Sequence, residues 1–290
     1  MKSNKSHFYY VFLLNTGMLF ISTSGVLGRY ISLPPPISIF IRSLIALFFI
    51  TLFAVYKKYT FKINYKSHGI AILLSGFFMA LHWITYFFSL QWSNVAIGMM
   101  ALFTYPLITV FLEPLFMNVK LQKRHFILGL MVIFGIYFLV PEFNIENSKT
   151  QGLLIGLLSA LAYSMRNLIL KKHNAMANGS IQMIYQLSVI IILLIPTFWL
   201  YPGIDIISQW PYLLILGLVT TAIGHTLFLN SFSHFSISTA SIMSSIQPLF
   251  GILLGSIFLY EIPNIKSIFG GILILMTVLI ENIYTKNNQL

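Results

Sequence analysis

Three ionisable side chains stand inside long apolar runs, where a charge is costly unless it has a partner. Arg42 lies in FIRSLIALF and Arg166 lies in SALAYSMRNLIL. Glu113 lies in YPLITVFLEPLF, where it could serve ion coupling or form an ion pair. A Glu113–Arg166 ion pair is one expectation, and it leaves Arg42 able to bind a carboxylate through two parallel hydrogen bonds. The alternative is a purely structural ion pair, or arginines that reach a membrane surface and serve stability alone.

Polar and aromatic side chains recur at one-turn spacing, which places them on single helix faces. His82 and Tyr86 are four residues apart, as are Ser159 and Tyr163. Such faces turn toward a bundle interior rather than toward lipid, although a single histidine more often serves packing than binding. The candidate substrate-binding residues are Arg42, His82, Trp83, Tyr86, Tyr105, Tyr163, Arg166, His225 and Gln247.

The sequence carries no recognisable signature of enzyme chemistry. It contains no cysteine, which removes disulfides, thiol catalysis and thiolate metal sites together. It has no HExxH, no GxSxG and no P-loop, so we expect no metal, no cofactor and no direct use of ATP. A membrane-embedded enzyme and a channel-like or structural membrane protein remain the alternatives to a transporter.

The composition identifies the solvent in which these residues work. Of 290 residues, 58% are hydrophobic and only 8% are charged, far from the composition of soluble proteins. Apolar windows of about 20 residues, each long enough to cross a bilayer, recur along the chain without the alternation of a membrane β-barrel. The sequence therefore predicts an all-α membrane protein with ten transmembrane helices, near 8–28, 37–56, 69–90, 95–117, 125–140, 152–170, 181–200, 211–232, 236–259 and 267–284.

Basic residues alternate between the two predicted faces of the membrane. One face would carry the lysines between residues 57 and 66, those between 120 and 124, Lys171 and Lys172, whereas the other would receive Arg29 and Glu261. This asymmetry is typical of the positive-inside rule and predicts cytoplasmic N- and C-termini in a plasma (inner) membrane protein. It also accounts for the formal net charge of +11 without nucleic acid, which we do not expect as a partner.

An internal repeat organises the chain. A shift of 142 residues superimposes Pro106 on Pro248 and Arg29 on Lys171 without a gap, although His225 then falls on Trp83. Two five-helix units follow, residues 1–141 and 152–290, joined by a linker at 142–151. Because five is odd, the second unit enters the membrane from the opposite face, as in the inverted repeats of secondary transporters.

The two repeated prolines, Pro106 and Pro248, are expected to kink their helices and to place Tyr105 and Gln247 at equivalent positions beside a cavity. Packing geometry alone is the other interpretation of these prolines. The pair Gly251 and Gly255 has GxxxG spacing, which suits close helix contact within the chain or in a homodimer.

The chain resembles the EamA family of the drug/metabolite transporter superfamily. The resemblance rests on the ten spans in two halves, FIRSLIALF, the PL pairs at Pro106 and Pro248, and LYEIP before a glycine-containing helix. The first half has Val119 where the second has Glu261, so a role for that glutamate is not repeated. The resemblance implies a secondary transporter of the lipid bilayer that exports amino acids or related small metabolites, with a carboxylate-bearing or zwitterionic substrate.

Overall fold

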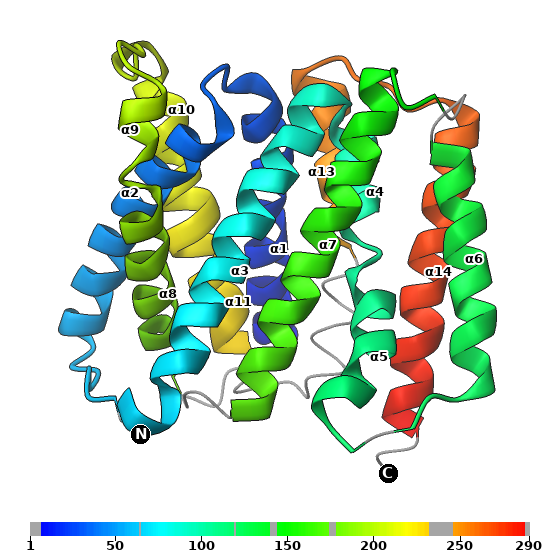
Figure 1. Cartoon of the computed structure of the whole chain (residues 1–290), viewed down its shortest axis with the longest axis horizontal. Coiled ribbons are helices and arrows are strands. Elements are labelled where there is room, and N and C mark those ends of the chain that lie inside the picture. Colours follow the sequence, from blue (N-terminus) through cyan, green and yellow to red (C-terminus); the bar gives the residue numbers. More distant parts are fainter. Residues whose placement is uncertain are drawn as a thin grey trace.

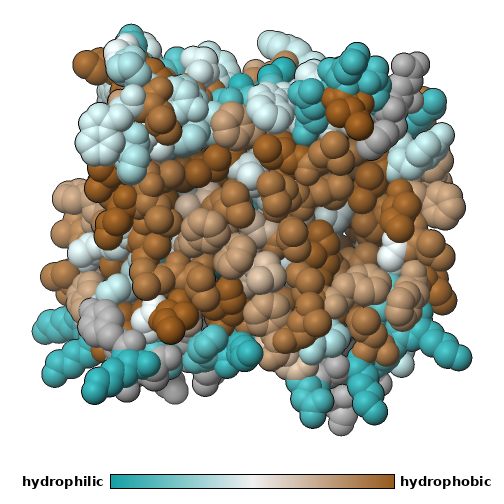
Figure 2. Space-filling model, in the orientation of Figure 1, coloured by the Kyte–Doolittle hydropathy of each residue, from teal (hydrophilic) through white to brown (hydrophobic). Residues whose placement is uncertain are grey.

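The computed structural model describes residues 7–63, 65–118, 120–139, 144–173, 178–231 and 246–287. In these ranges the chain forms helices and contains no strand. The long helices run side by side between two ends of the bundle, and α1 begins and α14 ends at the same end, the lower one in Figure 1. Figure 2 shows an apolar belt across the middle of the molecule, with hydrophilic side chains gathered at both ends, as a bilayer requires.

The first half of the chain contains six helices: α1 (His7–Tyr30), α2 (Pro35–Tyr56), α3 (Tyr65–Trp92), α4 (Val95–Leu102), α5 (Tyr105–Phe116) and α6 (Lys123–Leu139). Local sequence fixes several boundaries. Pro35 lies in the first turn of α2, where a missing N–H costs nothing, and Lys58 has the positive φ of 55° just after that helix ends. The side chain of Asn94 caps α4 by accepting from the Ile97 N–H.

The second half contains α7 (Ser148–His173), α8 (Gly179–Leu194), α9 (Thr197–Leu200), the 3₁₀ turn η1 (Ile207–Gln209), α10 (Trp210–Ile215), the π-helix η2 (Leu216–Gly224), α11 (His225–Ser231), α13 (Gln247–Phe258) and α14 (Ile265–Asn287). The elements α10, η2 and α11 follow one another without a break. A π-helix of this length inside a membrane-spanning segment is unusual, and such segments are often found at functional sites.

Seven segments among the described residues are long and apolar enough to cross a bilayer, and α13 is a shorter apolar helix. They agree with the predicted all-helical membrane protein. The count of ten spans stays a prediction, because residues 232–245, which hold the first part of the ninth predicted span, lie outside the described residues. The domain limits also stay a prediction, and α7 begins at Ser148, inside the predicted linker 142–151.

Both repeated prolines lie near the start of a helix, and the expected kink at Pro248 stays a prediction because residues 232–245 lie outside the described residues. The fourth predicted span is interrupted at Phe103 and Thr104, and Pro106 lies in the first turn of α5 rather than inside a bent helix. Pro248 likewise lies in the first turn of α13. The first turn of a helix has no intrahelical acceptor for its N–H groups, so a proline there starts a helix without losing a hydrogen bond.

Small residues bring the helices of the two halves close together. A Cβ atom on Gly251 would lie within 2.4 Å of the Met99 side chain, and one on Gly255 would lie 3.1 Å from Val95. The GxxxG spacing of α13 therefore serves contact with α4 of the same chain. A homodimer stays a prediction that this motif does not support.

Candidate functional site

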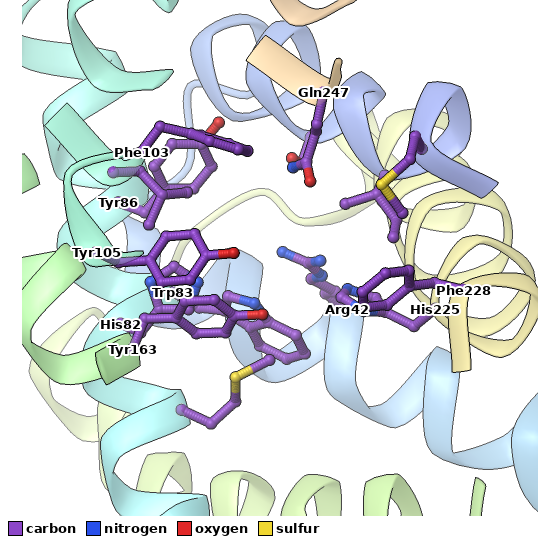
Figure 3. A pocket seen from close by; sticks show the side chains of 15 residues that line it. Arg42, His82, Trp83, Tyr86, Phe103, Tyr105, Tyr163, His225, Phe228 and Gln247 are labelled. Carbon is purple, nitrogen blue, oxygen red and sulfur yellow. The ribbon is translucent and has the colours of Figure 1, made fainter. Parts of the chain in front are cut away.

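A cavity lies between the two halves of the bundle, and residues of both halves line it. Its walls come from α1, α2, α3, the α4–α5 connection, α7, α11 and α13 (Figure 3). Eight of the candidate residues line it: Arg42, His82, Trp83, Tyr86, Tyr105, Tyr163, His225 and Gln247. The ninth, Arg166, does not.

Arg42 is the charged group of this cavity. Its side chain comes from α2 and is only 2% exposed. Nε donates to Thr221 Oγ1 at 2.7 Å, and the guanidinium carbon lies 4.0 Å from the centroid of the Trp83 ring. One edge and one face of the guanidinium are thus occupied, by a hydroxyl and by an aromatic ring.

The outer nitrogens of Arg42 are less well satisfied. Nη1 is buried and has no hydrogen-bond partner among the described residues, and none of the ion pairs found there involves Arg42. In Figure 3 the guanidinium points into the open centre of the cavity, and the Tyr105 hydroxyl and the Gln247 amide point toward the same space. A buried cation left in this state favours an anion as its missing partner.

The π-helix η2 holds Arg42 in place. Thr221 is fully buried, and its hydroxyl donates to the Leu216 carbonyl five residues earlier, at 2.8 Å. Because the hydroxyl has a single proton, its oxygen is left to accept from Arg42. Gly217 allows the contact: a Cβ there would lie 2.6 Å from Ile45 atoms and 3.1 Å from the Arg42 carbonyl oxygen.

His82 is fixed by Ser159, so two of the predicted polar faces meet. Ser159 Oγ donates to the His82 carbonyl at 2.9 Å and lies 2.7 Å from His82 Nδ1. Since the only hydroxyl proton goes to the carbonyl, Nδ1 carries the proton of the ring, and in a neutral imidazole Nε2 is then an acceptor. The ring stacks near Tyr86 and Tyr163, with centroids 6.1 and 4.6 Å away.

Aromatic rings form much of the remaining wall. The Tyr105 and Tyr163 rings meet edge to face, with centroids 4.8 Å apart, and the Trp83 and His225 rings lie 6.3 Å apart. Phe103 and Phe228 also line the cavity, although sequence patterns did not single them out. Their only signal was proximity to Tyr105 and His225 along the chain.

The predicted Glu113–Arg166 ion pair is wrong. Arg166 donates to Asn167 Oδ1 at 3.0 Å and to Gln186 Oε1 at 2.8 Å, whereas Glu113 pairs with Lys171. Arg166 turns toward α8, while Lys171, at the end of α7, reaches α5. Similar depth along two helices did not mean that the two side chains faced each other.

Two further ion pairs join the halves and were not predicted. Arg29 pairs with Glu261 at 2.8 Å, and Arg124 pairs with Glu281 at 3.1 Å. The charge pattern of the sequence places Arg29 and Glu261 at the same face of the membrane, and this was its only indication that the two residues could pair. Nothing in the described residues forms a cluster of histidines and acids that could hold a metal ion.

The profile of the EamA-like transporter family matches this chain twice, over residues 8–140 and 150–282. The pseudopaline exporter CntI of Pseudomonas aeruginosa is 24% identical over 208 residues, which are 71% of this chain and 72% of that protein. An uncharacterized transporter of Bacillus subtilis, YxxF, is 24% identical over 88% of this chain and 85% of its own length. A solved structure titled only as a crystal structure of a protein has a TM-score of 0.67, at 15% identity, over 98% of this chain and 100% of its own.

Proposed function

The chain belongs to the EamA-like transporter family, and on that premise we propose that it is a secondary transporter that exports amino acids or related small metabolites by alternating access. The family profile covers both halves, and the inverted repeats of secondary transporters place the substrate site between such halves. The relative CntI is a pseudopaline exporter, which supports export of a metabolite without naming the substrate of this chain.

The observation that carries the proposal is the Arg42 guanidinium inside the cavity. Nε is already bound to Thr221 and one face lies on Trp83, so a ligand must approach end-on through the two Nη groups. A carboxylate has two oxygens at the spacing that this approach requires. We therefore propose that the substrate carries a carboxylate and that Arg42 binds it.

The rest of the cavity suits a zwitterion. No aspartate or glutamate is among the described lining residues, so an amino group would meet uncharged acceptors and ring faces instead. His82 Nε2 is such an acceptor, and aromatic rings attract a cation through their electron-rich faces. In a small amino acid the carboxylate would pair with Arg42, and the ammonium would be held by these uncharged acceptors and ring faces.

The charge distribution supports a plasma-membrane protein with both termini in the cytoplasm. One end of the bundle holds the lysine-rich loops, the start of α1 and the end of α14 (Figure 1). By the positive-inside rule, we place this end in the cytoplasm. No P-loop is present in the sequence, so an ion gradient or the gradient of the substrate itself would drive transport.

Flux in proteoliposomes tests this function. We expect saturable counterflow of at least one labelled amino acid or related carboxylate, and no saturable flux of neutral sugars. Arg42→Lys keeps the charge but loses the planar fork, and Arg42→Gln loses both, so flux should fall in that order. Linear, unsaturable flux would favour a channel, and product formation from a lipid or peptide would favour an enzyme. Normal flux in both correctly folded variants would remove Arg42 from the site.

A further inference from the structure

The two repeats exchange ion pairs at opposite ends of the bundle. Arg29, in the last turn of α1, donates through Nε to Glu261, which lies between α13 and α14. Lys171, in the last turn of α7, donates to Glu113 of α5. Each pair therefore joins one half of the chain to the other. Figure 1 places the end of α1 and the end of α7 at opposite ends of the molecule.

The repeat relates the cations of these two contacts but not their acids, since Glu113 falls on Gly255 and Glu261 falls on Val119. The shift of 142 residues that superimposes the halves places Arg29 on Lys171. Each basic residue closes the first helix of its own half, and each acid lies in or just after the helix that begins with the repeated proline of the other half. Equivalent cations thus form ion pairs at opposite ends of the bundle, and this is the arrangement expected of two gates that open alternately. The pair Arg124–Glu281 joins α6 to α14 and has no such counterpart among the described residues.

The two contacts are of unequal strength. Glu261 uses both carboxylate oxygens, because Oε2 also accepts from the Val95 N–H at the start of α4, at 2.8 Å. Arg29 makes a second bond, from Nη1 to the Gln91 carbonyl at 2.8 Å. The Lys171 side chain is 63% exposed and that of Arg29 is 37% exposed, and exposed ion pairs are weak, so the added hydrogen bonds of Arg29 and Glu261 make the main difference. The end that carries Arg29 is therefore closed more firmly than the end that carries Lys171.

We propose that Arg29–Glu261 and Glu113–Lys171 are the alternating gate contacts of the cavity. Access from the Arg29 end requires the first pair to separate, and access from the Lys171 end requires the second. The resting protein opens more readily at the Lys171 end. This inference rests on the proposed transport function, but it concerns access to the cavity and not the identity of the substrate.

Cysteine accessibility tests the gates, because the parent chain has no cysteine. The reporter is Ser24→Cys, which lies in the cavity wall, labelled by a membrane-impermeant thiol reagent applied to the Arg29 end. We expect Glu261→Gln to raise the labelling rate about fivefold, the effect of a contact worth about 1 kcal/mol. Glu113→Gln should lower that rate by about twofold, because the opposite end then opens more often.

Matched variants separate gating from general loosening of the bundle. Arg124→Gln breaks an ion pair between the halves that is not exchanged by the repeat, and it should leave the labelling rate unchanged. The exchange Glu113→Lys with Lys171→Glu restores the second pair and should restore the parent rate. Equal rates in the parent, Glu261→Gln and Glu113→Gln, or a rise in both variants, would overturn the proposal.

Flux in the same proteoliposomes keeps the two proposals apart. Opposite labelling shifts without any saturable flux in the parent would support the gates and contradict the transport function. Saturable flux with labelling rates that the two variants do not change would support transport and overturn the gates.

Discussion

Replacing Thr221 with valine removes one hydroxyl from the cavity wall and nearly preserves the shape of the side chain. Thr221 Oγ1 accepts from Arg42 Nε at 2.7 Å, and both side chains are almost completely buried. Valine leaves that Nε–H without a partner, and a buried donor without a partner costs about 1–3 kcal/mol. Arg42 can escape this cost only by turning, which moves its Nη groups away from the place where a carboxylate would bind.

The expected result is a loss of affinity rather than of turnover. A binding penalty of about 1.4 kcal/mol raises the KM for a carboxylate substrate about tenfold, while the maximal rate changes little because the gates are untouched. Thr221→Ser keeps the hydroxyl and should stay within about twofold of the parent. The assay is the concentration dependence of counterflow in proteoliposomes, with thermal unfolding in detergent as the check on folding.

The comparison of Thr221→Val with Thr221→Ser decides whether Thr221 positions Arg42 for binding or only stabilises the fold. A structural role alone would lower the unfolding temperature of Thr221→Val and leave the KM of the folded fraction at the parent value. That result, or equal KM values for the two variants, would refute the claim that Thr221 positions Arg42 for binding.

Three further predictions follow from particular contacts. Gly217→Ala would bring a Cβ to 2.6 Å from Ile45 atoms, so overpacking should cost about 1–3 kcal/mol of stability, measured by thermal unfolding; an unchanged midpoint would contradict the close approach of α2 and η2. Lys62→Cys should react with an impermeant thiol reagent only after the cytoplasmic face is exposed, and labelling in intact cells would reverse the proposed topology. Arg166→Gln should lower the unfolding temperature, because it disrupts the hydrogen bonds with Gln186, but leave the KM within about twofold of the parent; a tenfold rise would place Arg166 in the binding site.

The sequence predicted the helical membrane architecture and the family, and the family match confirms the latter. Those features depend on composition, on the length of apolar runs and on repeated motifs, which are properties of single segments. The sequence also indicated which helix faces turn toward the interior of the bundle. His82 and Ser159 lie on two such faces, and their side chains form a hydrogen bond in the structure. A polar residue on an apolar helix has few stable places other than the bundle interior, so such faces are predictable.

The pairing of side chains was less predictable, because it depends on how each helix is rotated against its neighbours. Glu113 and Arg166 have similar depth but face different helices, so the expected ion pair does not form. The π-helix η2 changes the register of its segment, since its turn holds an extra residue. No sequence pattern predicts this change of helical register, or the contact between Thr221 and Arg42 that depends on it.

Ligands that differ only in the carboxylate test whether Arg42 recognises that group in the cavity. The measurement is the shift in unfolding temperature produced by a panel of L-amino acids, each compared with its own carboxamide, for the parent and for Arg42→Gln. We expect at least one acid to stabilise the parent with an apparent affinity at least about tenfold better than its amide, and we expect Arg42→Gln to abolish this preference. Equal stabilisation by acid and amide in the parent, or a preference for the acid that persists in Arg42→Gln, would contradict this role of Arg42.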